Sequence, residues 1–160
     1  MVALCRVDER LLHGQVAVTW LSQVQPDSIL IANDEVMENE MSKMALKMVK
    51  PSGVKMAIRS LEDGAKVLND PRAEKLKIFA VVKTLQDAVR LCELTDQVAR
   101  INVGGVKKKE GARLAAASVY LNGDDLAAVR KLVDMGKDVE FKMVPSESGK
   151  KAEQILAENK

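Results

Sequence analysis

The sequence has few aromatic residues, one histidine and two cysteines, and each shortage excludes a class of site. Its 160 residues include one Trp, one Tyr, two Phe and one His. So few rings provide neither a stacking surface for bases nor an aromatic cleft for a sugar. One histidine excludes a histidine-rich zinc site, and Cys5 and Cys92 are too distant in sequence to add a ligand cluster. We therefore expect no metal and no cofactor.

Long apolar runs and a strong net charge are also missing. No stretch reaches the roughly 20 apolar residues of a membrane-crossing helix, and the early charges of Arg6 and Asp8 leave no room for a signal peptide. The net charge is +2, and the lysines at 107–109 stand beside Glu110, which indicates a solvated face. Both cysteines have apolar neighbours, which is typical of buried free thiols in a reducing compartment. We expect a cytoplasmic protein that binds no nucleic acid.

Short β-branched runs alternate with amphipathic stretches along the chain. The expected strands lie at 2–5, 28–32, 54–58, 76–82, 98–103, 118–121 and 139–144, and the expected helices at 15–23, 38–49, 61–69, 85–94, 125–135 and 149–158. This order predicts an α/β fold, a single three-layer α/β/α domain over residues 1–160. Its sheet is expected to be open and mostly parallel, with six to seven strands and helices on both faces. The pattern does not predict which secondary structure residues 104–117 adopt.

The turn after the first strand carries the most chemistry, because sites in such sheets form beyond the carboxyl ends of strands. His13 stands in this loop or on the first turn of the next helix, where backbone N–H groups and the helix dipole favour negative charge. Gly14 has no side chain to obstruct a phosphate. Arg10 offers a planar fork of donors that suits phosphate oxygens. Asp8 is a candidate to orient the imidazole, and a backbone carbonyl is an equal one.

An imidazole suits reversible phosphoryl transfer, because its neutral ring has a nucleophilic lone pair at cell pH. The same local features are typical of a structural histidine, with Asp8 and Glu9 as helix-start charges and Arg10 as their ion-pair partner. The nucleotide-loop signature G-x-x-x-x-G-K-[ST] is absent. Two adjacent glycines, Gly104 and Gly105, follow a predicted strand and fit either an anion cradle or a tight turn.

The segment from Arg6 to Trp20 is far more specific than a bare His-Gly pair. It reads Arg-Val-Asp-Glu-Arg-Leu-Leu-His-Gly-Gln-Val with the tryptophan soon after. It resembles the start of the IIB component of the mannose/fructose/sorbose family of the sugar phosphotransferase system. Further similarity at 31–36, 82–84, 101–105 and 141–145 extends over nearly the whole chain. Glu9 replaces a common Asp and Leu12 a common Ile, and neither departure affects the chemistry.

The resemblance implies a phosphoryl carrier. His13 would accept a phosphoryl group, usually on Nδ1, from a phosphohistidine of the IIA component. It would then pass the group to a sugar held by the membrane components IIC and IID, so that uptake and phosphorylation occur together. Arg10 would hold the phosphoryl group. Because the chain has one histidine, the IIA partner is expected to be a separate polypeptide, and this chain to associate peripherally with the membrane transporter.

Several further residues are candidates for binding or orienting the phosphate. They are Asp8, Gly14, Gln15, Lys83 and Thr84. Lys83 and Thr84 resemble a strand end near the family's site, where they would add a charge and a hydroxyl. Thr84 also has an acid, Asp87, three residues later, which predicts a helix N-cap, as does Ser60 with Asp63. Asp34 fits either a site residue or a helix cap.

Two other functions fit the fold class. One is a signalling receiver-like module phosphorylated on an aspartate such as Asp34, with Lys83 and Thr84 nearby; it leaves the His13 segment unexplained. The other is a domain that binds a small anion without a covalent step. The sequence leaves open which sugar is carried and whether the chain self-associates.

Overall fold

The structure is a computed structural model that describes residues 1–159, except for the side chains of Gln15 and Val16. Nine strands and seven α-helices lie within this range. In chain order they are β1 (Val2–Asp8), α1 (Gly14–Val24), β2 (Ser28–Ala32), α2 (Asp34–Met37), α3 (Glu40–Met48), β3 (Lys55–Arg59), α4 (Leu61–Asn69), a 3₁₀ turn (Pro71–Lys75), β4 (Ile78–Val82), α5 (Leu85–Leu94), β5 (Arg100–Gly105), β6 (Arg113–Ala116), β7 (Val119–Leu121), α6 (Gly123–Asp134), β8 (Asp138–Phe141), β9 (Lys150–Lys151) and α7 (Ala152–Glu158).

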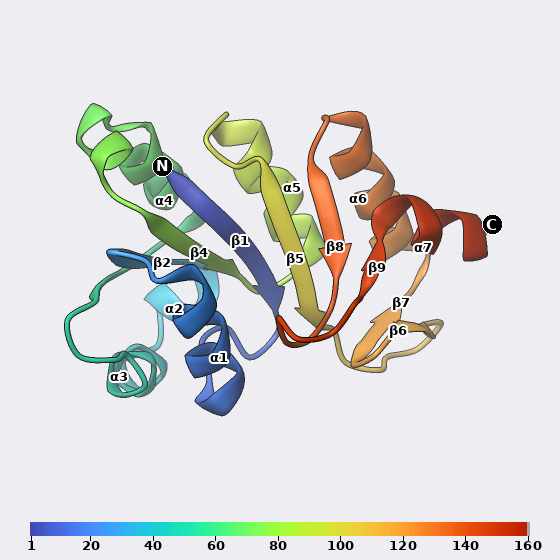
Figure 1. The fold of residues 1–160 in the computed structure, drawn as a ribbon, viewed down its shortest axis with the longest axis horizontal. Helices are drawn as coiled ribbons and strands as arrows, with labels where there is room; N and C mark the ends of the chain where they lie inside the picture. The colour runs from blue at the N-terminus through green and yellow to red at the C-terminus, as the bar shows by residue number, and fades with distance from the viewer. Residues whose placement is uncertain (160) are drawn as a thin grey trace.

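Seven of the strands form one sheet in the order β3-β2-β4-β1-β5-β8-β9 (Figure 1). The first six strands of this order run parallel, and β9 pairs antiparallel with β8. Strand β1 lies at the centre, with β4 on one side and β5 on the other. The expected α/β fold with a mostly parallel sheet is therefore confirmed.

Helices cover both faces of the sheet, and the alternation of side chains along each strand supplies the two cores (Figure 1). On one face, Leu4, Phe79 and Val81 pack with residues of α1, α2 and α3. On the other, Cys5, Val7 and their neighbours pack with residues of α4, α5, α6 and α7. This two-sided burial explains why the central strands read as continuous apolar runs.

Local signals explain most helix boundaries. The side chains of Ser60 and Thr84 accept the backbone N–H groups of Asp63 and Asp87, at 3.1 and 3.0 Å, so both predicted N-caps are confirmed. The helix expected at 38–49 is wrong in its extent. The side chain of Asn39 accepts the N–H of Ser42 at 3.0 Å, and this cap starts α3 at Glu40, separate from the short α2.

The region after β5 also differs from the expectation. The strand expected at 118–121 does not join the main sheet; as β7 it pairs antiparallel with β6, which occupies part of the undefined stretch 104–117. The last expected helix begins at Ala152, because Lys150–Lys151 first forms β9 on the sheet edge. Cys5 and Cys92 are free and buried, as expected.

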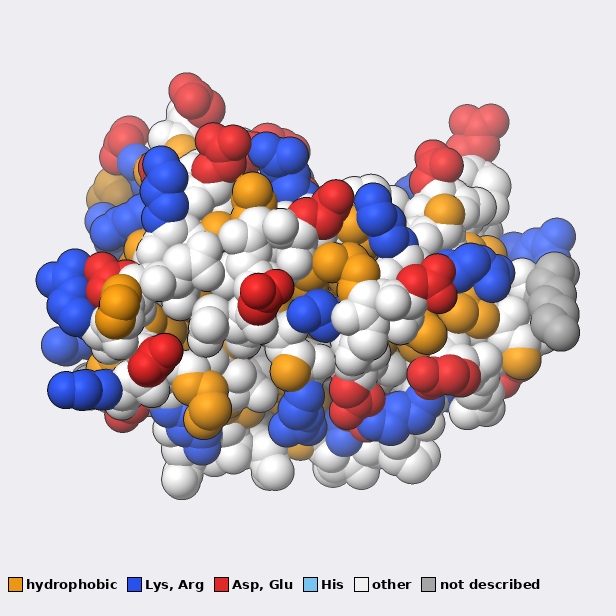
Figure 2. Space-filling view, turned by 90° about the horizontal axis from the view of Figure 1, so that it is seen from above, with side chains coloured by type: hydrophobic (Ala, Val, Ile, Leu, Met, Phe, Trp, Pro, Cys, Tyr) orange, Lys and Arg blue, Asp and Glu red, His pale blue; other side chains and the backbone are white. Residues whose placement is uncertain are grey.

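The parallel strands all begin on one side of the molecule and finish on the opposite side. Figure 2 looks onto the side where they begin; acidic and basic side chains intermingle there, and no histidine is visible. The carboxyl ends of the strands lie at the opposite edge, where the β1–α1 loop turns. Among the described residues, no helix has both the length and the apolar character needed to cross a membrane.

Candidate functional site

The β1–α1 loop is a tight turn fixed by its own aspartate. The N–H of Leu11 donates to the backbone O of Asp8 at 2.8 Å, and the N–H of Arg10 donates to Oδ1 of the same residue at 3.0 Å. The N–H of Glu9 donates to the O of Gly105 at 3.0 Å, which ties the turn to β5. Leu11 has a positive φ of 59°, a conformation that an apolar residue adopts only when its surroundings impose it. The loop is therefore held in one conformation.

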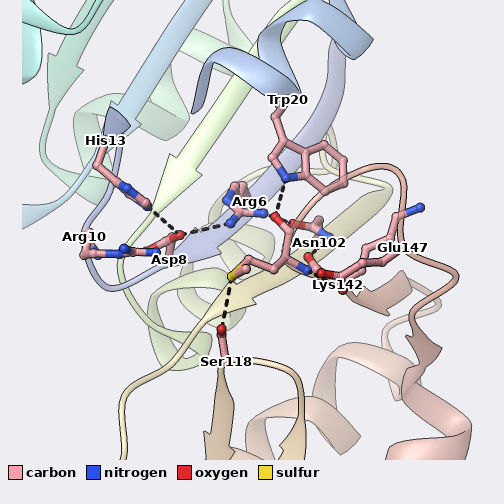
Figure 3. Close-up of polar contacts among 10 residues, drawn as sticks. Arg6, Asp8, Arg10, His13, Trp20, Asn102, Ser118, Lys142 and Glu147 are labelled. Carbon is pink, nitrogen blue, oxygen red and sulfur yellow. Dashed lines mark hydrogen bonds and ion pairs between the residues drawn. The ribbon is translucent and has the colours of Figure 1, made fainter. Parts of the chain in front are cut away.

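His13 lies at the N-cap position of α1, where its backbone O accepts the N–H of Ala17 at 3.1 Å. Its side chain is 22% exposed, and its Nε2 lies 3.1 Å from Oδ2 of Asp8 (Figure 3). When this carboxylate is ionised it only accepts hydrogen bonds, and the contact then requires the ring proton to be on Nε2. The lone pair of the neutral ring then lies on Nδ1. Of the two candidate orienters, Asp8 makes the contact.

Arg10 lies on the other side of the same carboxylate. Its Nε is 3.5 Å from Oδ1 of Asp8, and about half of its side chain is exposed (Figure 3). Asp8 itself has no exposed surface. The guanidinium thus combines a buried anchor with donors that reach solvent, as a group that grips an incoming phosphate requires.

A cavity of about 500 Å³ opens beside these residues. The β1–α1 loop, with Arg10 and His13, forms one wall, and residues of α2 and α3 form the other. Lys83, the first residue after β4, also lines the cavity, and its Nζ lies 3.3 Å from Oε2 of Glu35 on α2. The structure therefore brings Lys83 to the same cavity as His13.

The remaining candidates lie as follows. Gly14 starts α1 with a φ of 37°, and a Cβ built on it would meet no atom within 4 Å, so the conformation, not a lack of space, favours glycine there. The side chain of Gln15 lies outside the described part of the structure. Thr84 caps α5 and is not among the described residues that line the cavity. Asp34 is equally absent from that lining, and its Oδ1 accepts the N–H of Leu61, the first residue of α4, at 2.9 Å.

Two buried polar residues of the site, Arg6 and Asn102, were not predicted from the sequence. Arg6 is 2% exposed; its Nη2 donates to Oδ2 of Asp8 at 3.0 Å and its Nη1 to Oδ1 of Asn102 at 2.6 Å (Figure 3). Burial lowers the pKa of the Arg6 guanidinium from its ordinary value, and the nearby Asp8 opposes that shift. The sequence does contain a sign of the Arg6–Asp8 pair. The two opposite charges stand two residues apart at the end of an apolar strand, and this spacing places both side chains on the same face of the sheet.

The two glycines that end β5 make room for these side chains. A Cβ on Gly104 would lie 2.2 Å from Nη2 of Arg6, and a Cβ on Gly105 would lie 2.7 Å from Oδ1 of Asp8. Both strands are packed, so neither charged group can move aside cheaply. Gly104 and Gly105 form neither the anion cradle nor the tight turn that the sequence left open: they are the last two residues of β5, and they leave room for a buried ion pair.

Trp20 connects the site to the loop at 142–149. Its indole ring lies 5.4 Å from Cζ of Arg6, and its Nε1 donates to the O of Met143 at 2.7 Å (Figure 3). Nδ2 of Asn102 donates to the O of Lys142 at 3.0 Å. Arg6 is thus enclosed by the sheet, the indole and this loop. Within residues 1–159, no group of three or more His, Cys, Asp or Glu side chains is arranged to hold a metal ion.

Comparison with known proteins identifies relatives over nearly the full length of the chain. The model of the PTS system sorbose subfamily IIB component matches residues 2–160. A probable phosphotransferase enzyme IIB component of Streptococcus pyogenes is 38% identical over 152 residues, which cover 91% of this chain and 93% of that protein. A sorbose-specific EIIB component of Lacticaseibacillus casei is 31% identical over 147 residues, 92% of this chain and 90% of that protein. The crystal structure of the IIB domain of the sorbose permease from Klebsiella pneumoniae superposes with a TM-score of 0.93 at 27% identity, covering 100% of this chain and 98% of that one.

Proposed function

The chain belongs to the sorbose subfamily of IIB components of the phosphotransferase system, a phosphotransferase family, and we propose that His13 is the residue that carries its phosphoryl group. The group comes from a separate phosphorylated IIA protein and goes to a hexose or related sugar bound to the membrane components IIC and IID. Residues 1–160 act as one IIB domain, in the cytoplasm and peripherally on the transporter. Sugar selectivity lies in the membrane components.

The observation that carries the proposal is the bond between Nε2 of His13 and Oδ2 of Asp8, at 3.1 Å. It directs the ring lone pair to Nδ1, on a residue that lines the cavity beside Arg10. A nucleophile held in one tautomer next to a cation supplies the positioning and the charge stabilisation that phosphoryl transfer requires.

The step balances without a metal. The P–N bond of the donor phosphohistidine breaks as a P–Nδ1 bond forms on His13. The Nε2 proton stays in its bond to Asp8, and the carboxylate faces the positive charge that the ring gains, as in other histidine–aspartate pairs. In the second step the P–Nδ1 bond breaks, the phosphoryl group joins a sugar oxygen, and the sugar hydroxyl gives its proton to a base of the membrane component.

Phosphate labelling tests the acceptor. We expect His13→Ala to abolish labelling by the phosphorylated IIA partner while the circular dichroism spectrum stays unchanged. Asp34→Asn is the matched control, because the carboxylate of Asp34 is held by the first N–H of α4. The receiver-like alternative predicts the reverse, with a label that hydroxylamine cleaves. Phosphohistidine instead is lost in acid and survives base, and simple anion binding leaves no covalent label at all.

A second experiment tests the role of Arg10. We expect Arg10→Lys to slow transfer strongly and to change stability little, since an ammonium cannot replace the planar fork of donors. Arg72→Lys is the matched control: Arg72 also grips a carboxylate, that of Asp70 at 2.7 Å, on the surface. Equal transfer rates for Arg10→Lys and wild type would show that Arg10 is only a surface charge and does not hold the phosphoryl group.

A further inference from the structure

Arg6 is a buried cation with no role in the phosphoryl transfer proposed above. It is not among the described residues that line the cavity, so it cannot be assigned to the incoming phosphate. Its donors are engaged by Asp8 and Asn102, and the ring of Trp20 lies over it (Figure 3). Burying a charged side chain costs free energy of desolvation, which an oppositely charged partner must offset.

That partner is the carboxylate that orients His13. Oδ2 of Asp8 accepts from Arg6 at 3.0 Å and from His13 at 3.1 Å, so one oxygen serves both residues. Without the guanidinium, a fully buried carboxylate would face the imidazole with much less positive charge around it. Only the half-exposed Arg10, 3.5 Å from Oδ1, would then remain beside the carboxylate. We expect the Asp8–His13 pair in such a variant to bind a second proton at neutral pH, because a buried carboxylate that has lost its closest cation favours a proton nearby.

Either position of this extra proton removes the nucleophile. On the ring it makes an imidazolium, which has no lone pair. On Asp8 it turns the acceptor into a donor to Nε2, and the ring must then carry its own proton on Nδ1. Both outcomes leave Nδ1 unable to attack phosphorus.

We propose that Arg6 is a positioning residue that keeps the Asp8–His13 pair at one proton, held on Nε2, so that Nδ1 remains a nucleophile at neutral pH. This inference rests on the proposed function of His13. It extends that function by assigning the protonation state of the nucleophile to a residue of β1 that touches neither the phosphate nor the imidazole.

Several other charged groups lie around the pair. They are Glu9 and Arg10 in the β1–α1 loop, Glu35 on α2, Lys83 after β4, Lys107 after β5 and Glu147 in the loop at 142–149. Glu9 accepts the N–H of Lys107 at 3.0 Å, and Glu147 accepts the N–H of Met143 at 3.2 Å. Glu35 pairs with Lys83, whereas Arg10 is half exposed and contacts Asp8 at the longer distance of 3.5 Å. Arg6 is therefore the buried cation in direct contact with Asp8.

The test is the pH dependence of the rate at which IIA phosphorylates His13. In Arg6→Met we expect the acid limb of the profile to move to higher pH by about one unit or more, with a rate loss of about tenfold near neutrality. The rate should recover at high pH, where the second proton leaves. A purely structural role lowers the rate at every pH without moving the limb, and that result would overturn the inference.

Two further variants guard against a folding defect. Arg6→Lys keeps the charge and should keep the limb near its wild-type position. The double variant Arg6→Met with Asp8→Asn removes both buried charges together, which is far better tolerated than removing one. Its limb should return to the wild-type position or lie below it. A limb that stays displaced in the double variant contradicts the charge-balance explanation.

Nitrogen NMR of the wild-type protein gives an independent measurement. We expect His13 above neutral pH to carry its proton on Nε2, and the opposite tautomer would refute the inference without any variant.

Asp125→Asn is the matched control for the pH profiles, because Asp125 is a carboxylate of 2% exposure paired with Lys109 at 2.7 Å. Failure of the inference about Arg6 can be told apart from failure of the proposed carrier function. The pH profiles and the NMR tautomer decide the first, and the loss of label in His13→Ala decides the second.

Discussion

The carboxylate of Asp8 lies so close to the backbone of Gly105 that a Cβ built on this glycine would be 2.7 Å from Oδ1 and 2.9 Å from Cγ. The two residues face each other across the parallel pairing of β1 and β5. Since the same carboxylate bonds His13, the absence of a side chain at position 105 is a condition for the geometry of the nucleophile.

Gly105→Ala should therefore impair phosphoryl transfer without any contact to the phosphate. We expect the methyl group to displace Asp8, to cost about 1–3 kcal/mol of unfolding free energy, and to slow phosphorylation of His13 by about ten- to a hundredfold. Urea unfolding and a rate measurement with phosphorylated IIA check both numbers. Gly123→Ala, at an exposed site with no atom within 4 Å of the added Cβ, is the control and should leave transfer unchanged. A fully active Gly105→Ala would mean that the Asp8 geometry is not required.

Parts of the site that are local in sequence could be predicted from it. Asp8, Arg10 and His13 lie within one strand–loop–helix unit, and the position of that unit at the carboxyl end of a parallel strand places them together. The same holds for the caps at Ser60 and Thr84, which depend on residues three positions away.

Long-range partners could not be predicted, because the alternation of strands and helices does not give the strand order. Arg6 meets Asn102 only because β5 lies beside β1 in the sheet. Likewise Trp20 reaches Met143 only because the loop after β8 folds back over that part of the sheet. The expected first strand at 2–5 also ended too early, since Arg6 and Asp8 are polar yet lie within β1 as a buried pair.

Thr84→Ala distinguishes a helix cap from a phosphate ligand. The hydroxyl of Thr84 accepts the N–H of Asp87 at 3.0 Å, so its loss should lower the unfolding free energy by about 1 kcal/mol. We expect the transfer rate to stay unchanged, whereas Lys83→Met, at a position that lines the cavity, should slow transfer. Thermal unfolding and the phosphorylation rate measure the two effects. A large rate loss in Thr84→Ala at normal stability would instead assign the hydroxyl to the phosphate.

Trp20→Phe tests the tie between α1 and the loop at 142–149. The variant keeps a ring near Arg6 and removes the Nε1 bond to the O of Met143, so we expect a loss of about 1–2 kcal/mol. The loop should also become more susceptible to limited proteolysis, with cleavage sites mapped by mass spectrometry between 142 and 149. Unchanged stability together with unchanged cleavage would show that the contacts of Asn102 and Glu147 hold the loop without the indole.

Asp87 gives a prediction for the pH dependence of stability. Burial raises the pKa of its carboxyl above the ordinary value, with a smaller contribution from Asp34, while the Thr84 hydroxyl opposes the shift. The folded protein therefore holds this proton more tightly than the unfolded chain, and the stability linked to Asp87 is present at low pH and lost as the pH rises through the raised pKa. Asp87→Asn, which mimics the protonated form, should raise the unfolding free energy near pH 7 and change it little near pH 3. Urea unfolding of both proteins at the two pH values measures the difference.

Glu93→Gln on the exposed side of α5 is the control, since Glu93 pairs with Lys131 at 3.6 Å on the surface. A destabilised Asp87→Asn at neutral pH would show that the charge of Asp87 at the start of α5 contributes more than its burial costs.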